Sequence, residues 1–129
     1  MLTYDSRPRV VLNMDNGIYV FAPESATGKT FLFGLLRNLQ IAGDAIVTYN
    51  YWDHQVGVDL GKMIDKTHPK VVMIDRMDCF RMDRAIHDAI LQVWKSAIVL
   101  VDLKYLTPPP FKCKIADIDM SQDLIEVIG

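Results

Sequence analysis

Short, continuous runs of apolar residues alternate along this chain with longer segments in which apolar residues recur at helical spacing. Continuous runs of this kind are typical of strands that are buried on both faces of a sheet. A later segment alternates between apolar and polar residues, which is typical of a strand with one exposed face. Together these patterns predict strands over Arg9–Met14, Ile18–Ala22, Ala45–Tyr49, Val71–Asp75, Ala97–Asp102, Cys113–Met120 and Leu124–Ile128.

The segments between these strands predict helices. Four leucines lie on one helical face at spacing i, i+3, i+4 and i+7, namely Leu32, Leu35, Leu36 and Leu39. Helices are expected over Phe31–Ile41, Asp53–Lys66 and Phe80–Val93. Strands that alternate with helices imply right-handed crossovers and a mostly parallel sheet with helices on both faces.

Composition narrows the class of protein. A chain of 129 residues is long enough for one domain, residues 1–129, and its formal net charge of −2 gives no general attraction to nucleic acid or to a membrane surface. The N-terminus lacks the apolar core of a signal peptide, and no apolar run approaches the roughly 18 residues of a membrane span. Cys79 and Cys113 have no metal-ligand spacing, so we expect two free thiols in a cytoplasmic protein.

The most specific chemistry lies in the octapeptide PESATGKT at residues 23–30. It ends in Gly-Lys-Thr like a phosphate-binding P-loop, and it stands between a predicted strand and a predicted helix, as that motif requires. Backbone N–H groups of such a loop surround phosphate oxygens at the positive end of the helix. The residues expected to bind a nucleotide are Glu24, Ser25, Ala26, Thr27, Gly28, Lys29, Thr30 and Phe31. The alternative is an ordinary strand–turn–helix connection.

Two aspartates strengthen the first interpretation. Asp75 and Asp102 each end a continuous apolar strand. Ligands of parallel α/β sheets bind at the carboxyl ends of the strands, so both carboxylates should converge on the loop at 23–30. In that arrangement Lys29 would contact the β- and γ-phosphates, and the Thr30 hydroxyl would bind Mg²⁺.

The two motifs together resemble those of the P-loop NTPases of the AAA+ and RecA-like branch. The octapeptide is similar to the Gly-Pro-Glu-Ser-Ser-Gly-Lys-Thr loop of RecA-type recombinases, and VVMID at residues 71–75 resembles a Walker B segment. The resemblance implies a three-layer α/β fold with a mostly parallel five-stranded sheet in the order 5-1-4-3-2 and helices on both faces. In that order the strand at 97–101 lies between the strands at 18–22 and 71–75.

The resemblance also implies a ligand set. ATP and Mg²⁺ would bind together, with Thr30 and Asp75 holding the metal. Asp102 would stand at the end of the strand that carries the AAA+ sensor residue, where the family usually has Asn, Thr or Ser.

Two positions depart from the family pattern. Pro23 stands where the first glycine of the loop is expected, and proline has no N–H to offer a phosphate. Arg76 stands where the family has a glutamate that polarises the attacking water. Asp78 is the nearest carboxylate, and it is a candidate for that catalytic role or for the N-cap of the helix at 80–93.

The sequence therefore leaves several functions open. The first is an ATP-binding protein with weak or slow ATPase activity. The second is a degenerate P-loop module that does not hydrolyse nucleotide and acts in regulation or protein interaction; the missing AAA+ helical lid favours it. The third is a small-molecule kinase, and the lack of an obvious arginine-rich lid counts against it. The partners would be a nucleotide and another protein or a second copy, with no sign of nucleic acid or membrane. The aromatic segment Tyr49–Trp52 could stack a base, dock a partner or pack at the edge of the core.

Overall fold

The computed structural model of the chain describes residues 1–22, 28–80, 83–103 and 112–129, without the side chain of Asp78. Its strands are β1 (Leu2–Tyr4), β2 (Arg9–Asn13), β3 (Gly17–Phe21), β4 (Ile46–Tyr49), β5 (Val71–Ile74), β6 (Ile98–Val101), β7 (Lys114–Met120) and β8 (Leu124–Ile128). Its helices are α1 (Lys29–Ile41), α2 (Tyr51–Gln55), α3 (Leu60–Thr67), the 3-10 helix η2 (Met77–Phe80) and α4 (Arg84–Val93).

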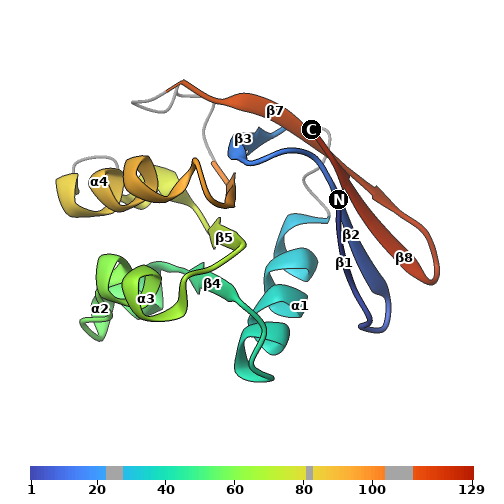
Figure 1. Ribbon diagram of the computed structural model, residues 1–129, viewed down its shortest axis with the longest axis horizontal. Helices are drawn as coiled ribbons and strands as arrows, with labels where there is room; N and C mark the ends of the chain where they lie inside the picture. Colours follow the sequence, from blue (N-terminus) through green and yellow to red (C-terminus); the bar gives the residue numbers. More distant parts are fainter. Residues whose placement is uncertain (23–27, 81–82, 104–111) are drawn as a thin grey trace.

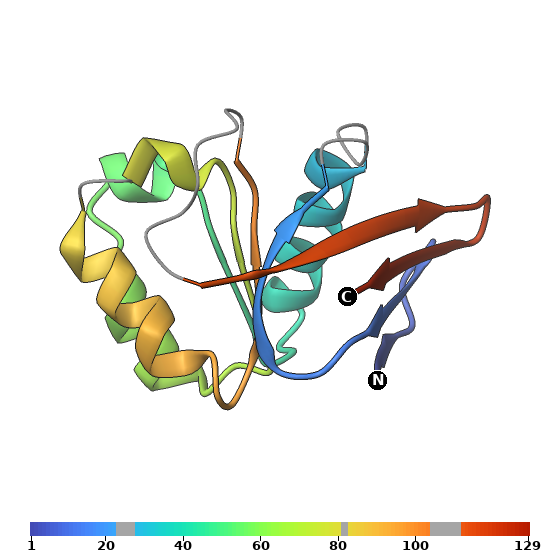
Figure 2. The same cartoon turned by 90° about the horizontal axis from the view of Figure 1, so that it is seen from above.

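All of these strands belong to one mixed sheet with the order β1-β2-β8-β7-β3-β6-β5-β4. Neighbours from β7 to β4 are parallel, β7 and β8 form an antiparallel pair, β8 is parallel to β2, and β1 is antiparallel to β2. The sheet does not stay flat, because β7 and β8 swing away from the central strands and β1 and β2 follow them (Figures 1 and 2). The result is a half-barrel that curves around α1.

The expected five-stranded, three-layer sheet is therefore wrong: the described part of the chain forms an eight-stranded mixed sheet. The apolar pattern located β2 and β8, but it did not show that they pair with each other and extend the sheet beyond β7. The alternating burial of both strands fits this position, since only one face of each strand packs on the core. The strand β6 does lie between β3 and β5, as the resemblance implied.

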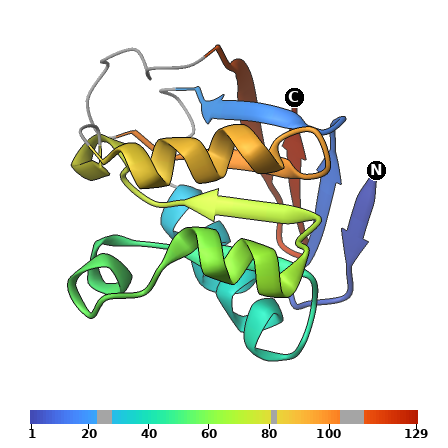
Figure 3. The same cartoon turned by 60° about the vertical axis from the view of Figure 1, so that its left-hand side comes forward.

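The core has two parts, one on each face of the central strands. On the concave face, Leu32 and Leu36 of α1 are fully buried in a cluster that includes Leu100 of β6 and Ile125 and Val127 of β8. On the other face, α3 and α4 lie side by side over the central strands (Figure 3). The helix α1 is thus enclosed between the central strands and the curled strands, which fixes its position.

Local signals explain where the other helices begin and end. The single helix expected over Asp53–Lys66 is wrong, because Gly57 adopts a left-handed φ of +84° and separates α2 from α3. A capping box between Asn50 and Asp53 starts α2, and the Asp59 carboxylate accepts the Lys62 N–H at 3.0 Å at the start of α3.

A polar network ties α1 to the edge strand β4. Arg37 Nε donates to the Thr48 hydroxyl at 2.9 Å, and its guanidinium also pairs with the Asp53 carboxylate. The Gln40 side-chain oxygen accepts the Thr48 backbone N–H at 3.0 Å. That N–H would otherwise face outward from an edge strand, so the network blocks edge pairing while it anchors α1.

The described helices include none that is long and apolar enough to cross a bilayer. Both cysteines are free thiols, with Cys79 exposed and Cys113 half-buried.

The enclosure of α1 makes a stability prediction. Leu36→Ala should lower the free energy of unfolding by about 2–5 kcal/mol, because it leaves a cavity between the two parts of the sheet. Ile41→Ala, at a position of α1 that is 78% exposed, is the matched control and should change it by less than about 0.5 kcal/mol. Urea denaturation followed by circular dichroism measures both, and equal small losses would contradict the enclosed position of α1.

Candidate functional site

The predicted site residues that the structure describes gather at the carboxyl edge of β3, β5 and β6. Gly28 precedes α1 directly, and Lys29 and Thr30 are its first two residues. Asp75 follows β5 and Asp102 follows β6, one step beyond the paired residues Ile74 and Val101. Glu24, Ser25, Ala26 and Thr27, together with Pro23, lie outside the described residues.

The central interaction of this edge is an ion pair between Lys29 and Asp102. Lys29 Nζ lies 2.8 Å from Asp102 Oδ1, and the two side chains are only 15% and 12% exposed. Among the described residues Oδ1 has no aligned hydrogen-bond donor, so the ammonium charge is what compensates this buried oxygen. The sequence placed both residues at the site but did not predict that they bind each other.

Backbone hydrogen bonds hold Asp102 in place. Its N–H donates to the Ile74 carbonyl at 2.9 Å, and its carbonyl accepts the Met77 N–H at 2.7 Å. Asp75 is held in the same way, because its N–H donates to the Tyr49 carbonyl at 2.9 Å. Both aspartates are therefore fixed on adjacent strands, with Asp75 half-buried and Asp102 buried.

Gly28 lies in a closely packed place, where a larger residue would press on two side chains of β7. A Cβ at this position would lie 3.0 Å from Ile118 Cγ2 and 3.1 Å from Met120 Sδ, so the end of β7 covers the start of α1. The N-cap Gly28 provides no side-chain hydrogen bond, and the first turn of α1 has no acidic residue. This helix end therefore offers positive potential without a carboxylate of its own. Thr30 and Phe31 are exposed beside it.

The residues after β5 differ from the expected hydrolytic arrangement. Arg76 stands where the family has the glutamate that polarises water. It is exposed, and its backbone turns sharply with a left-handed φ of +50°. Asp78 lies in η2, and its role in activating water stays a prediction. The alternative that Asp78 caps the next helix is wrong, since α4 begins at Arg84 and Asp83 accepts the Ile86 N–H at 3.2 Å.

The aromatic segment Tyr49–Trp52, which begins with the last residue of β4, divides into a buried and an exposed part. Tyr49 is 1% exposed, and its hydroxyl donates to the Val58 carbonyl at 2.9 Å and lies 3.2 Å from His54 Nδ1. Trp52 is 74% exposed on α2. Burial raises the pKa of Tyr49, and the nearby carboxylates of Asp53, Asp83 and Asp59 raise it further. No sequence signal distinguished the buried tyrosine from the exposed tryptophan.

The donor set can be tested for Mg²⁺. Among the described residues no group of three or more His, Cys, Asp or Glu side chains is placed to hold a metal ion. Mg²⁺ does not need such a group, because it is usually bound through one or two carboxylates with phosphates and waters completing the octahedron. A carboxylate at Asp75 and a hydroxyl at Thr30 are hard oxygen ligands that suit this ion.

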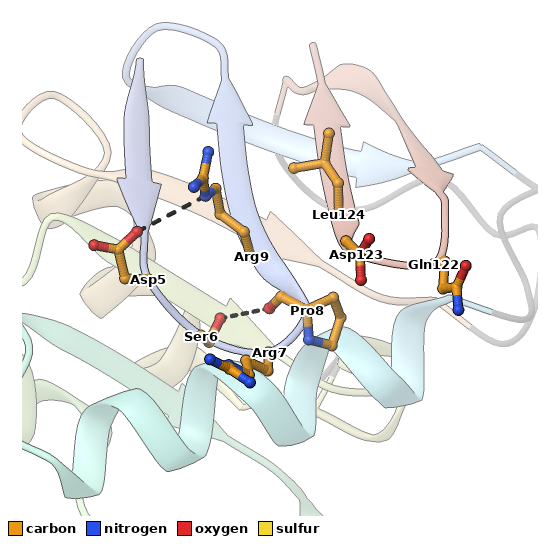
Figure 4. Close-up of a pocket in the computed structure, with 8 residues that line it drawn as sticks. All are labelled: Asp5, Ser6, Arg7, Pro8, Arg9, Gln122, Asp123 and Leu124. Carbon is orange, nitrogen blue, oxygen red and sulfur yellow. Dashed lines mark hydrogen bonds and ion pairs between the residues drawn. The ribbon is translucent and has the colours of Figure 1, made fainter.

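A large hollow lies at another place on the molecule (Figure 4). Its volume is about 890 Å³, and it is lined by Asp5, Ser6, Arg7, Pro8, Arg9, Gln122, Asp123 and Leu124. The Arg9 and Asp5 side chains are 59% and 93% exposed and 3.8 Å apart, so this ion pair is weak. None of its lining residues was predicted as a catalytic or binding residue, and they do not form a cluster of groups that could bind or react with a ligand.

Comparisons of the chain with protein-family models, with curated proteins and with solved structures found no match. The case for a function therefore depends on the residues at the start of α1 and at the ends of β5 and β6.

The ion pair predicts an asymmetric effect on stability. Lys29→Met should cost about 2–4 kcal/mol of unfolding free energy, because the short Asp102 side chain cannot reach solvent and stays buried without its partner. Asp102→Asn should cost clearly less, since the long Lys29 side chain can extend its ammonium group to water. Urea denaturation at pH 7 measures the two losses, and a larger loss for Asp102→Asn would contradict this account.

The raised pKa of Tyr49 predicts weaker folding at alkaline pH. A tyrosine whose folded pKa exceeds 10.0 contributes stability that is complete below pH 10 and is lost as the pH rises through the folded value. Unfolding free energy should therefore fall above about pH 10. Tyr49→Phe should be less stable at pH 8 through the lost hydrogen bond, yet show a shallower alkaline decline. Urea titrations from pH 8 to pH 11 test this, and parallel declines in both proteins would count against it.

Proposed function

We propose that this chain binds the phosphate groups of a nucleoside triphosphate, with Mg²⁺, at the start of α1. The observation that carries the proposal is the position of Lys29, whose ammonium group lies at the N-terminal end of α1 beside the ends of β5 and β6. A cation, a helix N-terminus whose N-cap glycine makes no side-chain hydrogen bond, and two aspartates on adjacent strands are the components that a Mg²⁺–triphosphate site needs.

Each residue has a separate role in this proposal. Lys29 would neutralise phosphate charge, and Gly28 would allow the chain to pass close to the phosphates as it passes close to β7. Thr30 and Asp75 would hold the metal, which would in turn draw charge from the phosphate oxygens. ATP is the nucleotide that the resemblance favours, and the residues at 23–27 would supply the backbone donors.

Weak or slow hydrolysis, or none, follows from the residues beside Asp75. Arg76 replaces the glutamate that would polarise water, and the only glutamates of the chain are Glu24 and Glu126. Glu126 lies in the middle of β8, paired with Asp119 on one side and Val11 on the other. Binding depends on Lys29, Thr30 and Asp75 rather than on a base, so it survives this change.

A second candidate is a regulatory or protein-interaction module that binds nucleotide without turnover, or not at all. The observation that favours it is the exposed aromatic and apolar surface of α2, where Tyr51, Trp52 and Val56 are 47%, 74% and 76% exposed. Rigid, exposed aromatic residues are common at protein interfaces. In either case we expect a cytoplasmic protein that acts with another protein or a second copy, without nucleic acid or a membrane.

A thermal melt with Mg-ATP tests the binding proposal. Ligand at about 100 times its dissociation constant adds about 2.7 kcal/mol, which should raise Tm by roughly 5–15 °C. Lys29→Met/Asp102→Asn is the informative variant, because it removes both charges and leaves neither one buried alone; it should lose the shift and still unfold cooperatively. No shift of the unaltered protein with any nucleotide would refute the proposal, and phosphate release would then separate an enzyme from a binding module.

A further inference from the structure

The Lys29–Asp102 ion pair has a consequence for what this site can bind. The lysine that should meet phosphate already pairs with a carboxylate 2.8 Å away. A phosphate oxygen in contact with Lys29 Nζ would therefore lie within a few ångströms of Asp102, inside a region where both side chains are largely shielded from water. Phosphate and Asp102 would compete for the same ammonium group and repel each other.

The position of Asp102 is fixed, so its carboxylate cannot move away from an incoming phosphate. Its backbone is bonded on both sides, to the Ile74 carbonyl and to the Met77 N–H, and its side chain is short and 12% exposed. The negative charge is thus a fixed part of the site. Lys29 has a long, flexible side chain, so it is the partner that can turn toward a ligand.

A second carboxylate adds to the effect. Asp75 follows the strand next to that of Asp102, and the residues before them are paired in register. A bare triphosphate would bring further negative charge close to Asp102, which already pairs with Lys29, and to the neighbouring strand end that carries Asp75. A triphosphate complexed with a divalent cation brings compensating positive charge to the same place.

We infer that Asp102 sets the charge selectivity of this site, so that it accepts the Mg²⁺ complex of a triphosphate and rejects the metal-free anion. This inference rests on the proposed function, and it adds a specificity-determining residue to that site. The family resemblance implied only a sensor position for Asp102, whereas the ion pair with Lys29 gives this residue a physical effect on binding.

Isothermal titration calorimetry tests the inference with two ligands, Mg-ATP and ATP in EDTA. The unaltered protein should bind Mg-ATP at least tenfold more tightly than metal-free ATP. Asp102→Asn removes the fixed charge at nearly constant shape and should tighten metal-free ATP at least tenfold, with a smaller change for Mg-ATP. Asp117→Asn changes the net charge equally at an exposed position of β7, and it should behave like the unaltered protein.

The outcomes separate this inference from the proposed function. If the unaltered protein binds Mg-ATP but Asp102→Asn leaves the ratio of the two affinities unchanged, Asp102 does not set selectivity and the binding function stands. If neither protein binds either ligand, the binding function is wrong and this inference falls with it. Asp102→Ser is the second variant should Asp102→Asn fail to fold by circular dichroism, and the same shift in ratio is expected from it.

Discussion

The packing of α1 inside the curve of the sheet determines where the candidate site lies. Leu32 and Leu36 are fully buried in one cluster with the central strands and the curled strands, so the helix can neither rotate nor slide without opening the core. Because the helix axis is fixed, its first residue is fixed as well. Lys29 is therefore presented to the end of β6, where Asp102 meets it.

The same two side chains therefore affect both the stability of the fold and the binding of a ligand. The pair of Lys29 and Asp102 holds the start of α1 against the sheet, and the same lysine is the group that a phosphate would need. Buried ion pairs contribute little net stability when complete but cost several kcal/mol when one partner is removed. A ligand can bind at such a site only if its interaction with Lys29 is more favourable than the ion pair with Asp102 that it replaces.

The sequence predicted individual elements better than their arrangement. Continuous apolar runs located β3, β4, β5 and β6, and leucine spacing located α1, because burial on both faces of a strand or along one helical face leaves a clear pattern. The pairing of β2 with β8 left no such pattern, since contacts between distant segments depend on which faces meet. For the site, the motifs brought Lys29, Asp75 and Asp102 to one edge, whereas the ion pair between two of them depends on side-chain reach.

We propose that a phosphate ligand binds at the start of α1, and residue-resolved NMR is the sharpest test of this proposal. A ¹H–¹⁵N spectrum titrated with Mg²⁺ and tripolyphosphate should show its largest shifts at the amides of Gly28, Lys29 and Thr30, with smaller shifts at Met77 and Asp102. Shifts confined to Arg7 and Arg9, or no shifts at all, would contradict the proposal. The first result would point instead to an exposed, non-specific anion contact.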